Sequence, residues 1–319
     1  MLYLHIGMSK TGSTTIQHFL TTTPLNDFGL HAISSFGQGN SWKLPAASGT
    51  PTAQRYWVRN RGILTEAEFD NLKTEVWDHL HQELADHTEN SGFIISSEYI
   101  YRQYFGQYKA LIKLRKKLLK HFDDLRIILY LRDQRSYMRS LYAQQVVGPT
   151  QSSKSFEEFF YSYKNAESGW NYQRGVRLWS KVFGAERLRL VPFDHRNFHQ
   201  GDLIRNFLGH MSSEAAERFT TSASKNISPG YRQIQASRMA NGLPELARRP
   251  ASYLLTGLSR YDAIGNLIGP KDFPSDFDDE ILDLVSEGND WINTNFLQEY
   301  AVKLPVKAVP AQPAAQQTA

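Results

Sequence analysis

Short apolar runs alternate with amphipathic segments along the first half of the chain. The apolar runs are too short for buried helices and predict buried strands at Leu2–Ile6, Phe93–Ser97, Leu125–Leu131 and Glu186–Val191. Apolar residues at spacings of three to four predict helices over Thr14–Thr22, Thr65–Leu84, Gln107–Phe122 and Asp133–Val146. Such an alternation is typical of a parallel sheet with helices on both faces.

The pattern changes after about residue 200, where strand signals stop and helices dominate. We therefore expect a single α/β domain over residues 1–300, built as a P-loop-like three-layer sandwich with a central parallel sheet and a helical part at 200–300. Residues 36–62 are rich in Gly, Ser, Pro and Asn and predict a long loop that shapes a binding site. Residues 305–319 are low in complexity, which predicts a disordered tail.

Composition narrows the classes of function. Of the 319 residues, 41% are hydrophobic and 21% are charged, as in ordinary globular proteins. The absence of cysteine excludes disulfides, thiolate metal sites and cysteine nucleophiles. A net charge of +4 is too small at this length to predict nucleic-acid binding, and it suits a pocket for a polyanion equally well. With neither a leader segment nor an apolar run of ~18 residues, we expect a cytoplasmic protein without membrane insertion.

The first predicted strand leads into a loop with two glycines, a lysine and several hydroxyl residues, followed by a helix. Unpaired N–H groups and the helix dipole make such a helix start a binding site for phosphate or sulfate. Gly12 would let the backbone approach an anion, and Lys10 would add a positive charge. In a Walker A loop the lysine follows the second glycine, whereas Lys10 precedes Gly12 here, which disfavours a magnesium-dependent NTPase. A simple strand–turn–helix connection is the structural alternative.

The segment His5–Gln17 (HIGMSKTGSTTIQ) resembles the 5′-phosphosulfate loop of sulfotransferases that use 3′-phosphoadenosine 5′-phosphosulfate (PAPS). It is close to the K-T-G-T-T form of bacterial members, some of which act on carbohydrates. The resemblance implies that the 5′-phosphosulfate would be held by Lys10, Thr11, Gly12, Ser13, Thr14 and Thr15.

The same family has a second motif, a strand that ends in Arg and a helix with Ser eight residues later. Arg132 and Ser140 have this spacing after the strand Leu125–Leu131. The resemblance implies that these two side chains bind the 3′-phosphate of PAPS. The alternative is that Arg132, Arg135 and Arg139 form a solvated basic face, while Asp133 caps the helix.

Glu98 is the candidate general base, because it follows a buried strand and would lie at the same edge of the sheet as Gly7 and Arg132. Glycan sulfotransferases that resemble this chain place a Glu near the sulfuryl group. Alternatively, Glu98 caps the next helix or pairs with Arg102. His5 and His31 are the other candidates for the base.

The sequence therefore predicts a sulfotransferase that moves a sulfuryl group from PAPS to a hydroxyl of a glycan or small molecule, without a metal. A P-loop nucleotide kinase-like phosphotransferase and a catalytically inactive PAPS-binding protein are the alternatives. A basic-aromatic cluster in the predicted loop would suit a glycan or an anionic acceptor, or belongs to a solvated loop; it comprises Arg55, Tyr56, Trp57, Arg59 and Arg61. The sequence indicates no oligomeric state.

Overall fold

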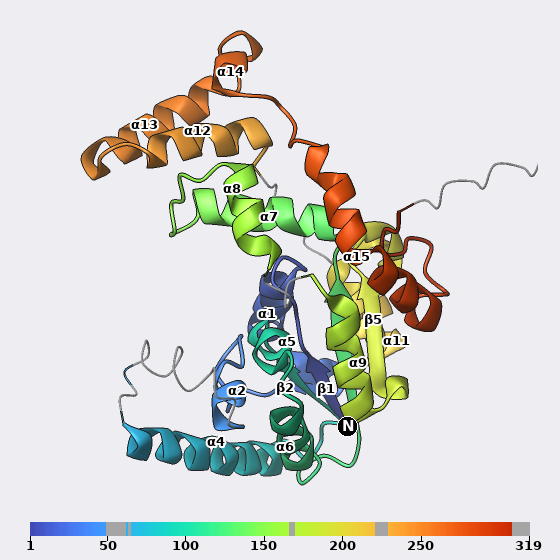
Figure 1. Cartoon of the computed structure of the whole chain (residues 1–319). Helices are drawn as coiled ribbons and strands as arrows, with labels where there is room; N and C mark the ends of the chain where they lie inside the picture. Colours follow the sequence, from blue (N-terminus) through green and yellow to red (C-terminus); the bar gives the residue numbers. More distant parts are fainter. Residues whose placement is uncertain (49–61, 63–64, 166–169, 221–228, 308–319) are drawn as a thin grey trace, which may run out of the picture.

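The structure of this chain is a computed structural model that describes residues 1–48, 62, 65–165, 170–220 and 229–307 (Figure 1). Five strands form one parallel sheet in the order β2-β3-β1-β4-β5. The strands are β1 (Leu2–His5), β2 (Leu30–Ala32), β3 (Gly92–Ser96), β4 (Leu125–Leu131) and β5 (Leu188–Pro192). The predicted α/β class, with a central parallel sheet, is confirmed.

Helices follow the strands in the first half and fill the chain after β5. The helices of the first half are α1 (Ser13–Thr22), α2 (Lys43–Ala47), α4 (Glu66–Asp86), α5 (Tyr99–Tyr104), α6 (Tyr108–Leu118), α7 (Gln134–Val147), α8 (Phe156–Lys164) and α9 (Tyr172–Phe183). The later ones are α10 (Leu203–Gly209), α11 (Ser213–Arg218), α12 (Tyr231–Asn241), α13 (Glu245–Leu258), α14 (Asp262–Ile268) and α15 (Asp276–Phe296).

The two faces of the sheet are covered by different helices because side chains alternate along each strand. In β4, Ile127 and Leu129 face a core shared with α4, α5, α6 and α9. Ile128 and Tyr130 face the opposite core, which α1, α10 and α11 complete. The result is the predicted three-layer sandwich.

A third apolar cluster contains no strand residue. It joins α7, α8, α12 and α15 through side chains such as Tyr142, Phe160, Ile234 and Val285. This cluster fixes α7 beyond the sheet edge and places α12 beside it. From there α12, α13 and α14 extend away from the sheet as an arm (Figure 1).

The segment predicted as a long loop, 36–62, is not a loop throughout. Helix α2 lies within it, and Leu44, Ala46 and Ala47 of this helix are fully buried. Five residues are too few to show a helical period, which is why the sequence pattern did not indicate α2. The basic-aromatic cluster Arg55–Arg61 lies outside the described residues.

The end of the described chain packs against α15. The carbonyl of Pro305 accepts a hydrogen bond from Asn289 at 2.7 Å, and Lys307 forms an ion pair with Asp283. Residues 305–307, which the sequence pattern places in the tail, are therefore held by α15. Residues 308–319 lie outside the described part of the chain.

Candidate functional site

The loop between β1 and α1 makes a tight turn at the carboxyl edge of the central strand. Lys10 and Gly12 both have left-handed backbone conformations, with φ of 66° and 75°. A Cβ on Gly12 would lie 2.3 Å from Cδ2 of Leu203, so only glycine fits beside α10. The turn brings the N-terminus of α1 to this edge, where the described part of the chain provides no side-chain cap. Its first N–H groups are therefore oriented for an anion.

The hydroxyl groups of this loop divide into two pairs. Thr11 and Ser13 are buried, and both donate hydrogen bonds to the carbonyl of Met8, at 2.7 and 3.0 Å. Thr14 and Thr15 are exposed on the first turn of α1. The Thr11 and Ser13 side chains therefore shape the loop, so that these two residues would offer an anion their N–H groups. The hydroxyls of Thr14 and Thr15 are open to a ligand.

Arg132, at the end of β4, is tied directly to this loop. One of its guanidinium nitrogens donates a 2.9 Å hydrogen bond to the carbonyl of Lys10, 122 residues earlier in the sequence. Its guanidinium also lies over the ring of Phe193, 5.8 Å from the ring centre. Burial lowers the pKa of Arg132, but a guanidinium stays charged in proteins. The two predicted anion motifs therefore meet at one place.

The three arginines after β4 differ in their partners. Arg135 pairs with Asp133, which also caps α7, and Arg139 pairs with Asp278 of α15 at 2.7 Å. Among the described residues, Arg132 has no carboxylate partner in hydrogen-bonding range. The capping role considered for Asp133 is confirmed. The three arginines do not form a uniform solvated basic face, because Arg135 and Arg139 are paired with carboxylates. Arg132 is the charge of this motif that is left for a ligand.

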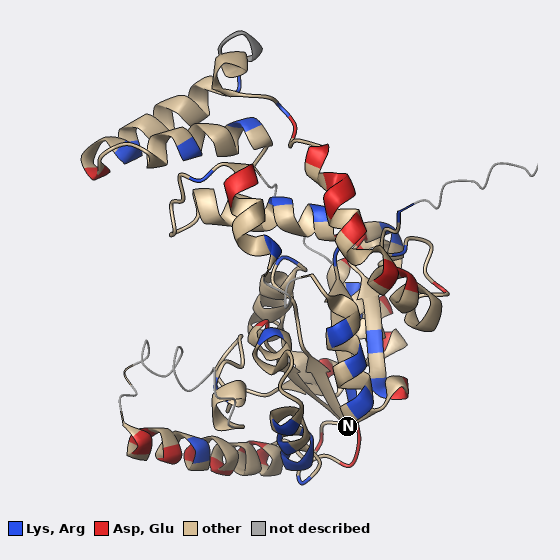
Figure 2. Ribbon diagram, viewed as in Figure 1, with Lys and Arg blue, Asp and Glu red and all other residues tan. Residues whose placement is uncertain are grey.

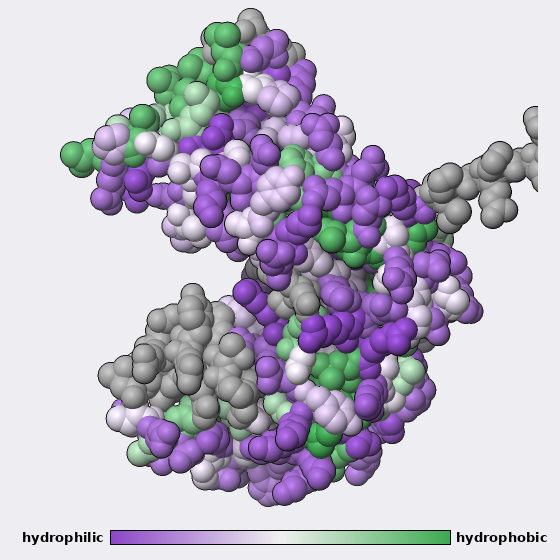
Figure 3. Space-filling view, in the orientation of Figure 1, coloured by the Kyte–Doolittle hydropathy of each residue, from purple (hydrophilic) through white to green (hydrophobic). Residues whose placement is uncertain are grey.

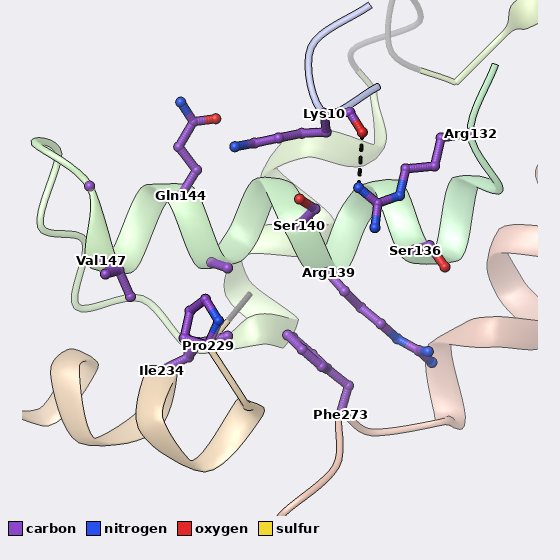
Figure 4. A pocket seen from close by; sticks show the side chains of 12 residues that line it. Lys10, Arg132, Ser136, Arg139, Ser140, Gln144, Val147, Pro229, Ile234 and Phe273 are labelled. Atoms are coloured by element: carbon purple, nitrogen blue, oxygen red, sulfur yellow. Dashed lines mark hydrogen bonds between the residues drawn. The ribbon is translucent and has the colours of Figure 1, made fainter. Parts of the chain in front are cut away.

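Lys10, Arg132 and Ser140 line the same cavity, which has a volume of about 400 Å³ (Figure 4). It follows α7 from its N-terminal half toward Val147, with Ile234 of α12 and Phe273 on the opposite side. The cavity is completed by Ser136, Arg139, Ala143, Gln144, Gly148 and Pro229. Polar side chains line the cavity along α7 and at Lys10, while Ile234 and Phe273 add apolar surface, so the cavity suits a ligand with a charged part and an apolar part.

Glu98 lies two residues beyond the end of β3 and close enough to Lys10 for the two charges to affect each other. Burial raises the pKa of Glu98, and the Lys10 ammonium acts in the opposite direction. Conversely, burial lowers the pKa of Lys10, the Glu98 carboxylate raises it and Arg132 lowers it. The carboxylate makes no capping hydrogen bond to α5, and no ion pair with Arg102 occurs among the described residues. Glu98 is therefore the N-cap residue of α5, but its carboxylate does not cap the helix and does not pair with Arg102 among the described residues.

The two histidines considered as bases lie elsewhere. His5 is completely buried within β1, where its Nδ1 atom is 2.8 Å from Oγ of Ser96, and burial lowers its pKa to about 3. It is therefore neutral and shielded from a substrate. His31 lies in the edge strand β2 and contacts Glu83 at 2.9 Å, with its ring stacked on His87. Neither histidine lines the cavity that contains Lys10 and Arg132, and Glu98 does not line it either, although the charges of Glu98 and Lys10 affect each other.

Several residues of the cavity were not predicted from the sequence. Gln144, Ile234 and Phe273 line it from three separate segments, and Phe193 supports Arg132. Ser136 and Ser140 are one helical turn apart on α7, so a search for hydroxyls at this spacing could have found Ser136. Gln144, Ile234 and Phe273 carry no motif, because their segments are brought together only by packing in the folded chain.

Comparison with known proteins shows a likeness to a solved structure but none to a family model or a curated protein. Among solved structures, a sulfotransferase from Alicyclobacillus acidocaldarius is similar, with 14% sequence identity and a TM-score of 0.41. The alignment covers 82% of this chain and 96% of that chain. In the described ranges, no helix combines the length and the apolar character that crossing a bilayer requires.

Proposed function

We propose that this protein transfers a sulfuryl group from PAPS to a hydroxyl group of a glycan or small-molecule acceptor. The observation that carries the proposal is the convergence of Lys10, Arg132 and Ser140 on one cavity, from two segments 122 residues apart. Arg132 and Ser140 offer a planar fork and a hydroxyl donor, which suit a phosphate.

The residues of the β1–α1 loop would hold the 5′ end of the donor. The N–H groups of Ser13, Thr14 and Thr15 point away from α1 and favour negative charge. PAPS, when bound, supplies the sulfuryl group and an anionic leaving group. Lys10 would stabilise charge that develops on the leaving oxygen, and the partial burial of its ammonium, which weakens screening, supports this role.

Glu98 would remove the proton from the acceptor hydroxyl. A carboxylate with a pKa above its ordinary value is a stronger base than a solvated one, and burial produces that shift here. The Lys10 ammonium acts against burial and so favours the ionised form of Glu98. A base, a cation for the leaving group and an anion-binding helix start are together what in-line group transfer requires of a protein.

Donor choice distinguishes this proposal from the two alternatives. The purified protein would be incubated with sulfur-labelled PAPS and a panel of glycans and phenols, with ATP and magnesium in parallel. We expect label transfer from PAPS that falls at least a hundredfold in Lys10→Ala. Phosphoryl transfer from ATP alone would instead indicate a kinase-like enzyme. Tight binding of 3′-phosphoadenosine 5′-phosphate (PAP) without transfer to any acceptor would indicate an inactive binding protein.

A further inference from the structure

Helix α13 of the arm carries an apolar face on the outside of the protein. None of its 14 residues is buried, and Leu246, Tyr253 and Leu254 are 96%, 88% and 61% exposed. Tyr253 and Leu254 follow Leu246 by seven and eight residues, so the three side chains lie on one face of the helix. In Figure 1, α13 lies on the side of α12 that faces away from α7. Figure 3 shows apolar side chains along this outer surface of the arm.

Large exposed apolar side chains are concentrated in the arm. Within the described ranges, the five that are most exposed all belong to it: Leu246, Tyr253, Leu254, Tyr261 and Leu267. Single exposed apolar residues are ordinary on a protein surface, but a group of them marks a contact with another molecule or with a membrane. The arm therefore presents an interaction surface.

Arginines flank the apolar face of α13. Arg249 precedes Tyr253 by four residues and Arg260 follows it by seven, so both lie beside that face, Arg260 just beyond the helix end. Both are exposed, and neither side chain has a hydrogen bond or ion pair within the part of the chain that the structure describes. Residues 231–260 contain five Arg and one Glu. Figure 2 shows these basic residues spaced along α12 and α13, so the apolar face lies in a positively charged surface.

Helix α6 shows that positive charge alone does not produce such a surface. It is also basic, with Lys and Arg in its last turn, but Leu111, Leu114 and Leu118 are fully buried. Its apolar face therefore packs on the core and only its basic face meets solvent. On α13 the apolar face and the flanking arginines are exposed together, which is typical of helices that lie in the interface of a membrane.

We propose that the arm docks on the surface of an anionic phospholipid bilayer. Leu246, Tyr253 and Leu254 enter the boundary between headgroups and acyl chains, where a Tyr ring is favoured because it has an apolar body and a polar hydroxyl. Arg249 and Arg260 bind lipid phosphates, for which a guanidinium offers paired donors. The 14 residues of α13 rise about 21 Å, so the helix lies along the interface.

Two observations separate this docking surface from other roles of the arm. None of its five side chains lines the cavity that contains Lys10 and Arg132, so the proposal does not depend on sulfuryl transfer and its failure would leave that function untouched. A second copy of the chain is a poorer partner than an anionic bilayer, because pairing two arms would bring surfaces of like charge together.

Vesicle flotation tests the charged part of the surface. The vesicles contain phosphatidylcholine alone, or equal parts of phosphatidylcholine and phosphatidylglycerol. We expect partitioning onto the anionic vesicles to be at least tenfold stronger, since each Arg near an anionic surface adds roughly a fivefold preference. Arg249→Gln/Arg260→Gln should lose at least tenfold. The control Lys113→Gln/Lys116→Gln removes the same charge from exposed positions on α6 and should change partitioning less than twofold.

The apolar part of the surface is tested in the same assay. Leu246→Ser/Tyr253→Ser should also lose at least tenfold in partitioning onto anionic vesicles, while the circular dichroism spectrum is retained because both side chains are exposed. The control Leu284→Ser/Val306→Ser removes exposed apolar side chains from outside the arm and should change partitioning less than twofold. Equal losses in an arm variant and its control would overturn the proposal.

A fluorophore on the arm distinguishes a bilayer from a second copy. Because the chain has no cysteine, Leu246→Cys offers a single attachment point for an environment-sensitive dye, with Glu75→Cys on α4 as the comparison. We expect a blue shift of emission with anionic vesicles at position 246 alone. A shift that depends on protein concentration without vesicles, together with a dimer in light scattering, would assign the face to a second copy and overturn the proposal. No flotation, or equal flotation with both kinds of vesicle, would overturn it as well.

Discussion

Replacing Glu98 by Gln separates the proposed base from a structural carboxylate. The amide keeps the size of the side chain but cannot accept a proton at neutral pH. If Glu98 is the base, kcat should fall by roughly 10²–10⁴, the usual contribution of acid–base catalysis, which corresponds to about 2.7–5.4 kcal/mol of barrier. PAP affinity should change less than threefold, because Glu98 does not line the cavity that contains Arg132 and Ser140.

A structural Glu98 would make the Glu98→Gln variant less stable than wild type. We expect the opposite change in thermal stability. Burial raises the pKa of Glu98, so the folded state favours the protonated form and is penalised when the carboxylate ionises above that pKa. Glu98→Gln removes this penalty at pH 8. The variant should therefore melt at the same or a higher temperature than wild type at pH 8, with the difference vanishing below the unfolded-state pKa.

The assay combines kcat at saturating PAPS, PAP calorimetry and melting curves at pH 4 and pH 8 on the same preparations. Glu75→Gln is the matched control, because Glu75 is exposed on α4, far along the chain from the cavity residues. A Glu98→Gln enzyme with kcat within threefold of wild type would refute the base assignment. A clear loss of Tm at pH 8 would refute the account of its environment.

Three further changes test other parts of the account. Lys10→Ala removes the cation that lowers the pKa of Glu98, so the acidic limb of the kcat/KM profile should move to higher pH in the residual activity; an unmoved limb would separate the two residues. Gly12→Ala places a Cβ 2.3 Å from Leu203 in a left-handed turn, so PAP binding should weaken at least tenfold by calorimetry while the circular dichroism spectrum is retained. Thr65→Ala breaks the capping box with Glu68, so urea unfolding should show a loss of about 1 kcal/mol with unchanged kcat.

The sequence was most informative where one segment determines its own structure. Strand β4 has the predicted bounds, Leu125–Leu131, because six of its seven residues are apolar or aromatic and the run ends at the charged Arg132. The helix start at Thr65 was also predicted, since a capping box needs only residues three apart. Strand β2 has three residues, too few for a periodic signal, and its place is set by pairing with β3.

Features of the site that depend on packing could not be predicted in this way. The loop pattern does not show that Thr11 and Ser13 turn inward to the carbonyl of Met8, because either orientation is compatible with the same letters. Likewise, the carboxylate that pairs with Arg139 comes from Asp278, 139 residues later. Only the folded chain therefore distinguishes Arg132 from Arg135 and Arg139 as the arginine that has no carboxylate partner among the described residues.

The central claim is that Arg132 and Ser140 form a site for a 3′-phosphate next to the β1–α1 loop. Calorimetry of PAP and AMP on wild type and Arg132→Gln tests it directly, since the two nucleotides differ in that phosphate alone. We predict that wild type binds PAP at least tenfold more tightly than AMP, and that Arg132→Gln removes this preference while AMP affinity changes little, because a hydrogen bond to a charged group contributes about 1.5–3 kcal/mol. Equal affinities for PAP and AMP in the wild-type protein would contradict the account.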